Sequence, residues 1–507
     1  MSAGQLAMTR SDRVGLLARA LDDLESGRLT NVAAACRRLL AIAPGDVEAK
    51  LLLGLALGAQ GQLDEAMPLM DAVARARPSH AHPCRDLAEL LIRLGRPAEA
   101  AVQFRAWLTQ APADAGAHHA LGVALAELGE IEAAISHLRR AVAIDPAPAA
   151  GWSNLGMLLK IEHRFDEAMT AHDAAVLRAP HDAQIRVNHA VALLHAGRLT
   201  EAWRDYEWRL RQPGHTGLPL ATLLPDIAKL DLRERTILVT HEEGFGDTLQ
   251  FVRYVPLLAE RGARVVLAVP RELERLARGF AGVAELCAFG TPLPRFDYHC
   301  PVFSLPRAFG TTMETIPGET PYLSVDPALI ARWESRLPPG GLRVGLVWAG
   351  QARPWLPGFS TLDGRRSAGI AAFAPLAEVP GVQFISLQKG PAAAELVPAG
   401  LVLHDPMPQV ADFADTAAIV AGLDLVVSVD TAVVHLAGAL GKPVFLLDRY
   451  DNCWRWFSER EDSPWYPRLR IFRQERLGDW TTPVRRVAKA LAAMPGESRA
   501  STTLRTR

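Results

Sequence analysis

The chain has 507 residues, enough for about three domains of ordinary size, and 49% of them are hydrophobic, so a large buried core is feasible. Its 55 Lys and Arg residues balance 56 Asp and Glu residues, which argues against a nucleic-acid-binding protein. The five cysteines lack CxxC spacing, which argues against zinc sites and a disulfide framework. The N-terminus has no apolar signal region, and no uncharged run approaches the roughly 20 residues of a membrane span. We therefore expect a cytoplasmic protein that neither binds nucleic acid nor spans a membrane.

A proline recurs every 34 residues through the first two-fifths of the chain, and the series ends near Pro213. Its members are Pro44, Pro78, Pro112, Pro146 and Pro180. Each proline is expected to end a helix, because its ring cannot continue the hydrogen-bond ladder.

Three other positions repeat with the same period. A small residue stands where two helices should approach closely, at Gly54, Ala88, Gly122, Gly156 and Ala190. The turn between the helices carries Gly61, Gly95, Gly129 and Gly197, with His163 as the departure. An alanine marks the crossing of the second helix, at Ala66, Ala100, Ala134, Ala168 and Ala202. The pattern resembles the tetratricopeptide repeat and predicts an all-α solenoid of five to six repeats over residues 12–213.

The second half of the chain changes from helical repeats to short β-rich runs separated by helical patterns. This alternation predicts an α/β fold with parallel sheets. A break near residues 338–341 divides it into lobes at 232–328 and 341–485, and residues 496–507 are expected to form a disordered tail. The expected strands are 236–240, 263–269, 283–289, 342–350, 382–390, 424–430 and 442–448. Ligands of such folds bind beyond the carboxyl ends of the strands, so the loops there are the candidate sites.

The first candidate loop, 241–251, follows the strand at 236–240. Gly244 and Gly246 allow a tight turn into a helix, with Asp247 at its start. Asp247 is either a general base facing a cleft or a capping residue, because Asp247 and Gln250 have the D-x-x-Q spacing of a capping box. No full G-x-G-x-x-G is present, which disfavours a dinucleotide oxidoreductase.

The second candidate loop follows the strand at 424–430. Asp430 and Thr431 can cap a helix whose free amides and positive end would suit a diphosphate. His435 lies four residues after Thr431, so both can face the same side. His435 is either a phosphate contact or a packing residue.

The third candidate loop, 350–370, is rich in glycine and proline and ends at Arg365, Arg366 and Ser367. Arginines there could clamp phosphate oxygens, although a solvated charged loop is the ordinary alternative. Lys389, after the expected strand at 382–390, is a further cation at the same edge.

These segments together resemble a known family. The pieces GFGDTLQFVRYVPLL, FDYHCPVFSLP, RVGLVWAG, FISLQKG and DSPWYPRLRIFRQ, with the Arg-Ser pair at 366–367 and the segment 412–444, fall in the order seen in bacterial tetratricopeptide-repeat glycosyltransferases. Their catalytic part is similar to glycosyltransferase family 9, the heptosyltransferase-like family. A lysine motif of the heptosyltransferases, K-x-W, is not evident in the first lobe, which leaves a heptose donor in doubt.

The resemblance implies a GT-B fold, in which two Rossmann-like lobes face each other across a cleft. The first lobe would bind the acceptor, and the second would bind a nucleotide-sugar. By matching motifs, Asp247 is implied as the base, and Thr431 and His435 as donor-phosphate contacts. Arg366 and Ser367 would assist them.

The hypothesis is an inverting glycosyl transfer from a nucleotide-diphosphate sugar to a hydroxyl of a glycan or a protein. No D-x-D sequence occurs, so we expect no metal and no cofactor, with protein cations stabilising the diphosphate. The repeats would recruit the acceptor or a protein partner. The alternative is a repeat scaffold whose transferase-like lobes are inactive. The sugar, nucleobase, acceptor and oligomeric state are not determined by the sequence.

Overall fold

The computed structural model describes residues 10–76, 83–212, 217–351 and 364–494. It divides into two compact units, Met1–Pro180 and His181–Arg507. The expected disordered tail and most of the loop at 350–370 lie outside the described residues.

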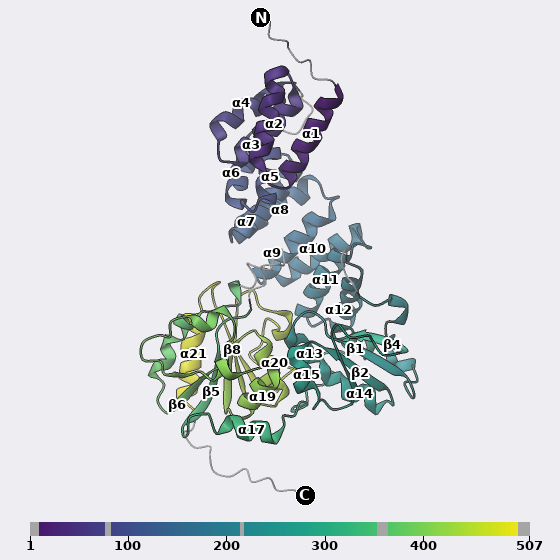
Figure 1. Cartoon of the computed structure of the whole chain (residues 1–507), viewed down its shortest axis with the longest axis vertical. Helices are drawn as coiled ribbons and strands as arrows, with labels where there is room; N and C mark the ends of the chain where they lie inside the picture. The colour runs from purple at the N-terminus through teal and green to yellow at the C-terminus, as the bar shows by residue number, and fades with distance from the viewer. Residues whose placement is uncertain (1–9, 77–82, 213–216, 352–363, 495–507) are drawn as a thin grey trace, which may run out of the picture. The chain divides into compact units, whose positions relative to one another are not determined.

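The first unit is an array of helices that pack consecutively in pairs (Figure 1). The all-α prediction for this part is therefore confirmed. The helices are α1 (Arg10–Glu25), α2 (Leu29–Ile42), α3 (Val47–Ala59), α4 (Leu63–Ala76), α5 (Pro83–Arg93), α6 (Pro97–Gln110), α7 (Ala115–Glu127), α8 (Ile131–Ile144), α9 (Ala149–Ile161) and α10 (Phe165–Arg178).

The periodic residues take the positions expected for them. Every second helix, from α2 to α10, ends two residues before its proline. A Cβ on Gly54 would lie 2.7 Å from Met70 Sδ, so the glycine permits close helix approach. The turn residues have left-handed backbones, with φ of +80° at Gly129. His163 adopts the same conformation with φ of +57°, although it is not a glycine.

A sixth helix pair opens the second unit. It consists of α11 (Ala183–His195) and α12 (Leu199–Tyr206), followed by the 3-10 turn η1 (Glu207–Arg211). Trp203 of α12 is buried, and its ring packs edge-on against Phe251 and Trp454 of the α/β part. The last repeat is thus built into the same compact unit as the sheets.

The first sheet has four parallel strands in the order β3-β2-β1-β4. Strand β4 was not among the expected strands, because it has only four residues and ends at Pro301. The strands are β1 (Thr236–Thr240), β2 (Arg264–Val269), β3 (Val283–Ala288) and β4 (Tyr298–Pro301). The helical segments around them are η2 (Leu220–Thr222), η3 (Ile227–Lys229), α13 (Phe245–Phe251), η4 (Val252–Tyr254), α14 (Val255–Glu260), α15 (Arg271–Ala277), η5 (Val302–Ser304) and α16 (Leu305–Ala308).

The second sheet has six parallel strands in the order β10-β9-β8-β5-β6-β7, so its direction of growth reverses between β5 and β8. Strands β7 and β10 were also missing from the expected set. The strands are β5 (Leu342–Val347), β6 (Val382–Ser386), β7 (Leu403–His404), β8 (Leu425–Val429), β9 (Val444–Asp448) and β10 (Leu469–Arg473). The helical segments are α17 (Pro327–Glu334), η6 (Ile370–Glu378), η7 (Pro391–Ala394), η8 (Met407–Gln409), α19 (Phe413–Ala421), α20 (Ala432–Ala439), η9 (Trp454–Trp456) and α21 (Thr481–Ala492).

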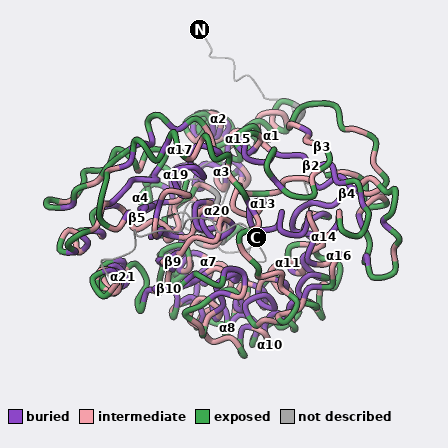
Figure 2. Tube along the Cα trace, turned by 90° about the horizontal axis from the view of Figure 1, so that it is seen from below, coloured by how far each residue is buried: buried purple, intermediate pink, exposed green. Residues whose placement is uncertain are grey.

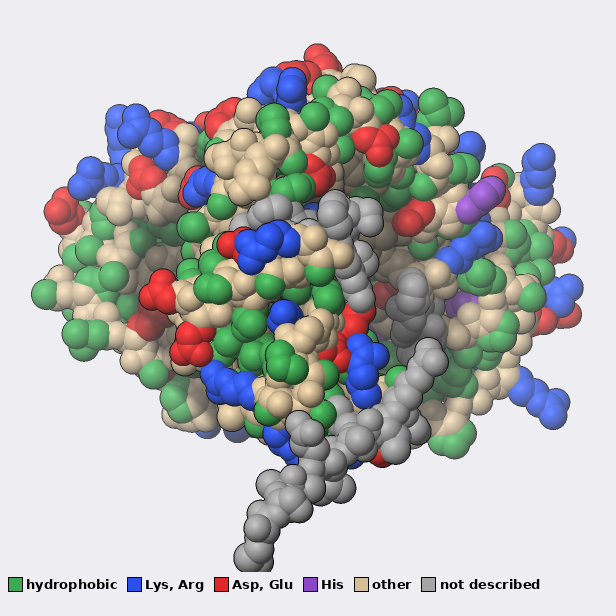
Figure 3. All heavy atoms as spheres, turned by 90° about the horizontal axis from the view of Figure 1, so that it is seen from above, with side chains coloured by type: hydrophobic (Ala, Val, Ile, Leu, Met, Phe, Trp, Pro, Cys, Tyr) green, Lys and Arg blue, Asp and Glu red, His purple; other side chains and the backbone are tan. Residues whose placement is uncertain are grey.

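Burial follows this architecture. Buried positions run along the strands and the central helices, and exposed positions lie along the outer loops (Figure 2). On the face drawn in Figure 3, basic and acidic side chains are interspersed, in keeping with the balanced composition. None of the helices within the described ranges has both the length and the apolar character needed to cross a bilayer.

Candidate functional site

The loop after β1 carries Asp247 into the first turn of α13. Gly244 is the N-cap residue, and its backbone N–H donates to Asp247 Oδ2 at 2.8 Å. The capping alternative is thus met in a different form: Asp247 belongs to a capping box, but as its third residue rather than as the N-cap, and Gln250 binds Arg455 instead of returning the bond. Because Gly244 has no side chain, the cap is made by the carboxylate three residues later. Glu243, just before it, has φ of +57°, a strained conformation for a residue with a side chain.

Arg455 of η9 binds the other oxygen of Asp247. Its Nη2 donates to Asp247 Oδ1 at 2.5 Å, and its Nε donates to Gln250 Oε1 at 2.7 Å. The guanidinium also lies 4.3 Å above the ring of Trp454. The side chains of Arg455 and Asp247 are 11% and 16% exposed, so the pair is largely enclosed.

Burial dominates the acid–base properties of this pair. Burial raises the pKa of Asp247; Arg455 and the Gly244 N–H oppose this, and Asp430 adds to it, leaving the pKa above its usual value. Burial by itself would lower the pKa of Arg455, but the charge of Asp247 keeps it raised, so Arg455 remains a cation. A carboxylate of raised pKa is a stronger proton acceptor when ionised, which suits a general base.

Glu243 is a second unusual carboxyl group in the same loop. Partial removal of the Glu243 carboxyl from water, together with the negative charges of Asp247 and Glu242, raises the pKa of Glu243 to about 7. Tyr206 Oη lies 3.5 Å from Glu243 Oε1, yet the residue remains exposed to solvent. Neighbouring carboxyls with raised pKa values titrate together, and such groups often mark functional sites.

The start of α20 lies close to the start of α13. A Cβ on Gly246 would lie 2.8 Å from His435 Cδ2 and 3.2 Å from Ala432 Cα, so glycine favours this close approach. Thr431 is the N-cap residue of α20, but its side chain makes no cap hydrogen bond. Its Oγ1 instead lies 3.1 Å from Ser428 Oγ. Asp430, next to it, acts electrostatically on Asp247, so the two predicted loops lie close together.

His435 lies inside this junction. It is 4% exposed, its Nδ1 lies 2.9 Å from Tyr466 Oη, and its ring stacks on Trp456. Burial and the nearby Arg455 and Arg253 hold the pKa of His435 well below its usual value, so the ring is neutral. A neutral ring can donate one hydrogen bond to a phosphate but adds no positive charge.

The remaining predicted donor-binding residues, Arg366, Ser367 and Lys389, lie beyond the carboxyl ends of β5 and β6. Arg366 Nη2 donates to the Gln351 carbonyl at 2.8 Å, and Ser367 Oγ accepts from the Gly350 N–H at 3.2 Å. Lys389 Nζ donates to the Val410 carbonyl at 2.6 Å. They share the sheet edge with Asp430 and Arg455, because parallel strands end at one edge.

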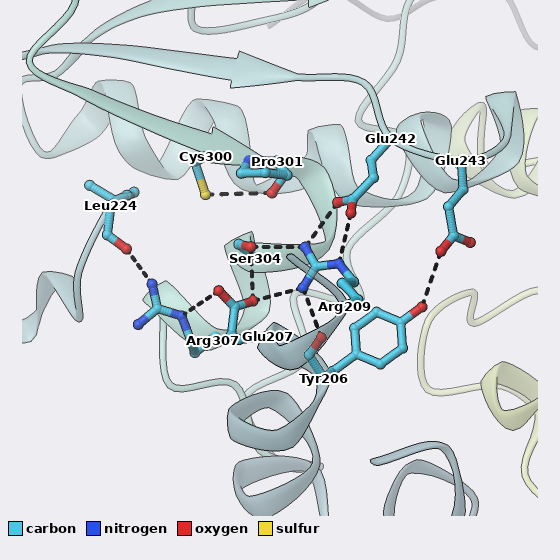
Figure 4. A network of polar contacts seen from close by, with 10 residues as sticks. All are labelled: Tyr206, Glu207, Arg209, Leu224, Glu242, Glu243, Cys300, Pro301, Ser304 and Arg307. Atoms are coloured by element: carbon cyan, nitrogen blue, oxygen red, sulfur yellow. Dashed lines mark hydrogen bonds and ion pairs between the residues drawn. The ribbon is translucent and has the colours of Figure 1, made fainter. Parts of the chain in front are cut away.

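Sequence reasoning missed Arg455 and Arg209. Arg209 of η1 donates from Nε and Nη2 to the two oxygens of Glu242, at 2.8 and 2.9 Å (Figure 4). Both arginines lie outside any motif, and their partners are far away in sequence. The only signal for Arg455 was its place in an aromatic-rich segment after an expected strand.

Within the described residues, no three His, Cys, Asp or Glu side chains gather closely enough to hold a metal ion.

Comparison with known families matches the repeats and one C-terminal segment of the chain. Tetratricopeptide-repeat families match residues 23–83, 57–104, 85–148 and 155–209. Glycosyltransferase family 9 (heptosyltransferase) matches residues 410–476. The chain therefore combines tetratricopeptide repeats with a glycosyltransferase family 9 segment. That segment contains Asp430, Thr431, His435 and Arg455.

Similar proteins cover different parts of the chain. Protein FlbA of Caulobacter vibrioides is 28% identical over 508 residues, which is 87% of this chain and 83% of FlbA. A thermophilic tetratricopeptide-repeat protein from Thermus thermophilus is 24% identical, with a TM-score of 0.27, and covers 34% of this chain and 93% of its own. The pilF protein of Pseudomonas aeruginosa is 14% identical, with a TM-score of 0.30, and covers 40% of this chain and 93% of its own.

Proposed function

We propose that this chain transfers a sugar from a nucleotide-diphosphate donor to a hydroxyl acceptor. The proposal is carried by one observation: Asp247, with a raised pKa, meets the family 9 segment through Arg455 and the start of α20. The two parallel sheets, each with its own helices, would form the two Rossmann-like lobes of a GT-B transferase. The acceptor would bind at the four-stranded sheet and the donor at the six-stranded sheet.

In this mechanism, Asp247 takes the proton of the acceptor hydroxyl while that oxygen attacks the anomeric carbon. The bond from the anomeric carbon to the diphosphate oxygen breaks in the same displacement, which inverts the configuration. Base catalysis of this kind contributes roughly 10²–10⁴-fold to the rate. Arg455 holds the carboxylate in place through its 2.5 Å contact and keeps it ionised.

The leaving diphosphate would be stabilised by protein groups at the donor edge. The positive end of α20 at Thr431 favours an anion, and Arg366, Ser367 and Lys389 supply further donors. His435 would contribute one neutral hydrogen bond. The site needs no metal in this scheme, because cations of the chain carry the charge.

The repeats would bring the acceptor or a protein partner to the transferase. Both a glycan and a protein hydroxyl fit this role, and the cytoplasm is the compartment we propose. A tetratricopeptide scaffold with an inactive transferase part is the alternative. The scaffold alternative requires that Asp247 cannot act as a base, for example because its hydrogen bond with Arg455 prevents it from accepting a proton.

The first experiment screens nucleotide sugars by thermal shift, using UDP-, GDP-, ADP- and dTDP-sugars. A ligand at one hundred times its Kd adds about 2.7 kcal/mol to the free energy of unfolding. Asp247→Asn should retain binding of the selected nucleotide sugar and lose transfer by roughly 10²–10⁴-fold. Asp231→Asn, at an exposed ion pair with Arg233, is the matched control and should keep full turnover.

Two results would decide against the proposal. Undiminished turnover by Asp247→Asn would remove Asp247 as the base. Absence of binding to every nucleotide sugar, together with tight protein binding through the repeats, would favour the scaffold.

A further inference from the structure

The end of the last repeat is connected to the loop that carries Asp247. Arg209, in the 3-10 turn after α12, is 5% exposed. It binds Glu242 through two parallel hydrogen bonds, and Glu242 is the second residue after β1 (Figure 4). Paired bonds of this kind fix both the position and the orientation of a carboxylate.

Arg209 is itself held from the opposite side. Its Nη1 donates to Glu207 Oε1 at 2.9 Å, and its Nη2 donates to Ser304 Oγ at 2.9 Å. Ser304 Oγ in turn donates to Glu207 Oε1 at 2.8 Å. Arg307 closes the group, with Nε 3.3 Å from Glu207 Oε2. The guanidinium therefore has one defined position, and so does the loop it binds.

We propose that Arg209 is a positioning residue for transfer, which fixes the loop 241–247 and with it Asp247. This inference rests on the proposed function. Glu242 lies five residues before Asp247, and the loop between them holds the strained Glu243 and the capping Gly244. A strained loop needs an external restraint to keep its conformation, and Arg209 supplies one. The sixth helix pair is then part of the transfer site as well as part of the repeats.

Loss of Arg209 also changes the charge around the loop. Glu243 faces the acidic Asp247 and Glu242, the cationic Arg455 and Arg209, and the Tyr206 hydroxyl. Without Arg209, Glu242 loses its cationic partner, and the pKa of Glu243, which Arg209 lowers, rises. Glu243 and Asp247 titrate as neighbouring carboxyls, so the acid limb of the pH–kcat profile, which reports the pair, moves to higher pH.

The test compares Arg209→Met, Arg209→Lys and Arg211→Met in the full chain. Arg211 belongs to the same turn, but its guanidinium stacks on Trp208 and is the matched control. Hydrogen exchange followed by mass spectrometry needs no substrate. Arg209→Met should speed exchange of the amides of residues 241–250 by about tenfold, with the rest of the α/β part unchanged. Arg209→Lys keeps the charge without the paired bonds, and should give an intermediate rate.

The second readout is the pH–kcat profile with the donor found by thermal shift. Arg209→Met should lower kcat more than it raises KM and shift the acid limb upward, and Arg209→Lys should restore the limb. The proposal would be overturned if the exchange rates of Arg209→Met match those of Arg211→Met. It would also be overturned if exchange in Arg209→Met rises evenly over residues 181–494. If Arg209→Met speeds exchange only in the loop 241–250 but the protein uses no sugar donor, the result supports the restraint of this loop by Arg209. The same result would overturn the proposed function.

Discussion

The fifth and sixth helix pairs share one repeat pattern but belong to different units. Helix α10 of the fifth pair has 14 residues, whereas α12 of the sixth has 8 and passes into the 3-10 turn η1. Ala175, buried in α10, precedes Arg209 by one period of 34 residues. The repeat therefore determines the backbone of both pairs, while a few side chains determine what each pair binds.

Trp203 shows the same difference. It is 1% exposed, its Nε1 donates to the Thr311 carbonyl at 3.2 Å, and its ring contacts Phe251 and Trp454. One period earlier, the chain has Met169, which is only partly buried. The last pair thus replaces an ordinary repeat residue with a large aromatic side chain that joins it to the transferase-like part.

The largest expected effect comes from removing that aromatic side chain. Trp203→Ala should lower the free energy of unfolding of the His181–Arg507 unit by about 3–5 kcal/mol, because it leaves a cavity among aromatic rings. Ile135→Ala, at a 1% exposed position in α8, should instead destabilise the Met1–Pro180 unit by about 2–5 kcal/mol. Calorimetry, with hydrogen exchange assigning each transition, separates the two.

If either variant lowers the protection from hydrogen exchange equally in both units, the expectation that each variant destabilises only its own unit is wrong. That result would show that the sixth pair is energetically continuous with the other repeats.

A smaller effect is expected from Glu243, whose carboxyl lies beside Tyr206 of the sixth pair. Its pKa is raised in the folded protein, so stability falls as pH rises from about 4.5 towards 7, because the unfolded carboxyl ionises in this range while the folded carboxyl stays protonated. Glu243→Gln removes this cost. It should stabilise the protein by up to about 1 kcal/mol at pH 8, allowing for solvent screening, and by little at pH 4.5. Urea unfolding at the two pH values measures the difference.

Glu234→Gln is the control for this pH dependence, because Glu234 is also an exposed glutamate with a left-handed backbone but lies outside the loop that carries Glu242, Glu243 and Asp247. A gain for Glu243→Gln that is the same at both pH values would show that backbone strain, rather than charge, sets the energy of this loop.

The repeats were predictable because their signals are local and periodic. Pro44 and its successors end helices by their own geometry, and Gly129 selects a left-handed turn within its own repeat. The longer strands were also predictable, since each is a β-rich run bounded by turn residues. The short strand β7 and the strand β10 were missed, because their pairing depends on neighbours in the sheet.

The candidate site was predictable only in part. Asp247 and Thr431 were predicted as candidates because both follow expected strands and precede helices. Arg455 and Arg209 were not, because their partners lie 208 and 33 residues away, and no local pattern specifies such pairs. The position of Asp247 in the capping box was also not predictable, because the D-x-x-Q spacing of Asp247 and Gln250 overlaps the G-x-x-D spacing of Gly244 and Asp247. Gln250 instead accepts a hydrogen bond from Arg455, which is distant in sequence.

The smallest expected effect concerns the turn of the fifth helix pair, which has His163 where the other repeats have glycine. His163 has φ of +57°, where a side chain crowds the backbone, while Gly197 fills the same turn of the sixth pair with φ of +71°. His163→Gly should stabilise the first unit by about 0.5 kcal/mol, less whatever the His163 ring gains from its edge contact with Phe165. Gly129→Ala is the reverse substitution, since a Cβ there meets no atom within 4 Å and only the backbone is strained. It should destabilise the unit by about 1 kcal/mol in urea unfolding. A loss of stability in His163→Gly would mean that side-chain contacts, rather than the backbone, hold this turn.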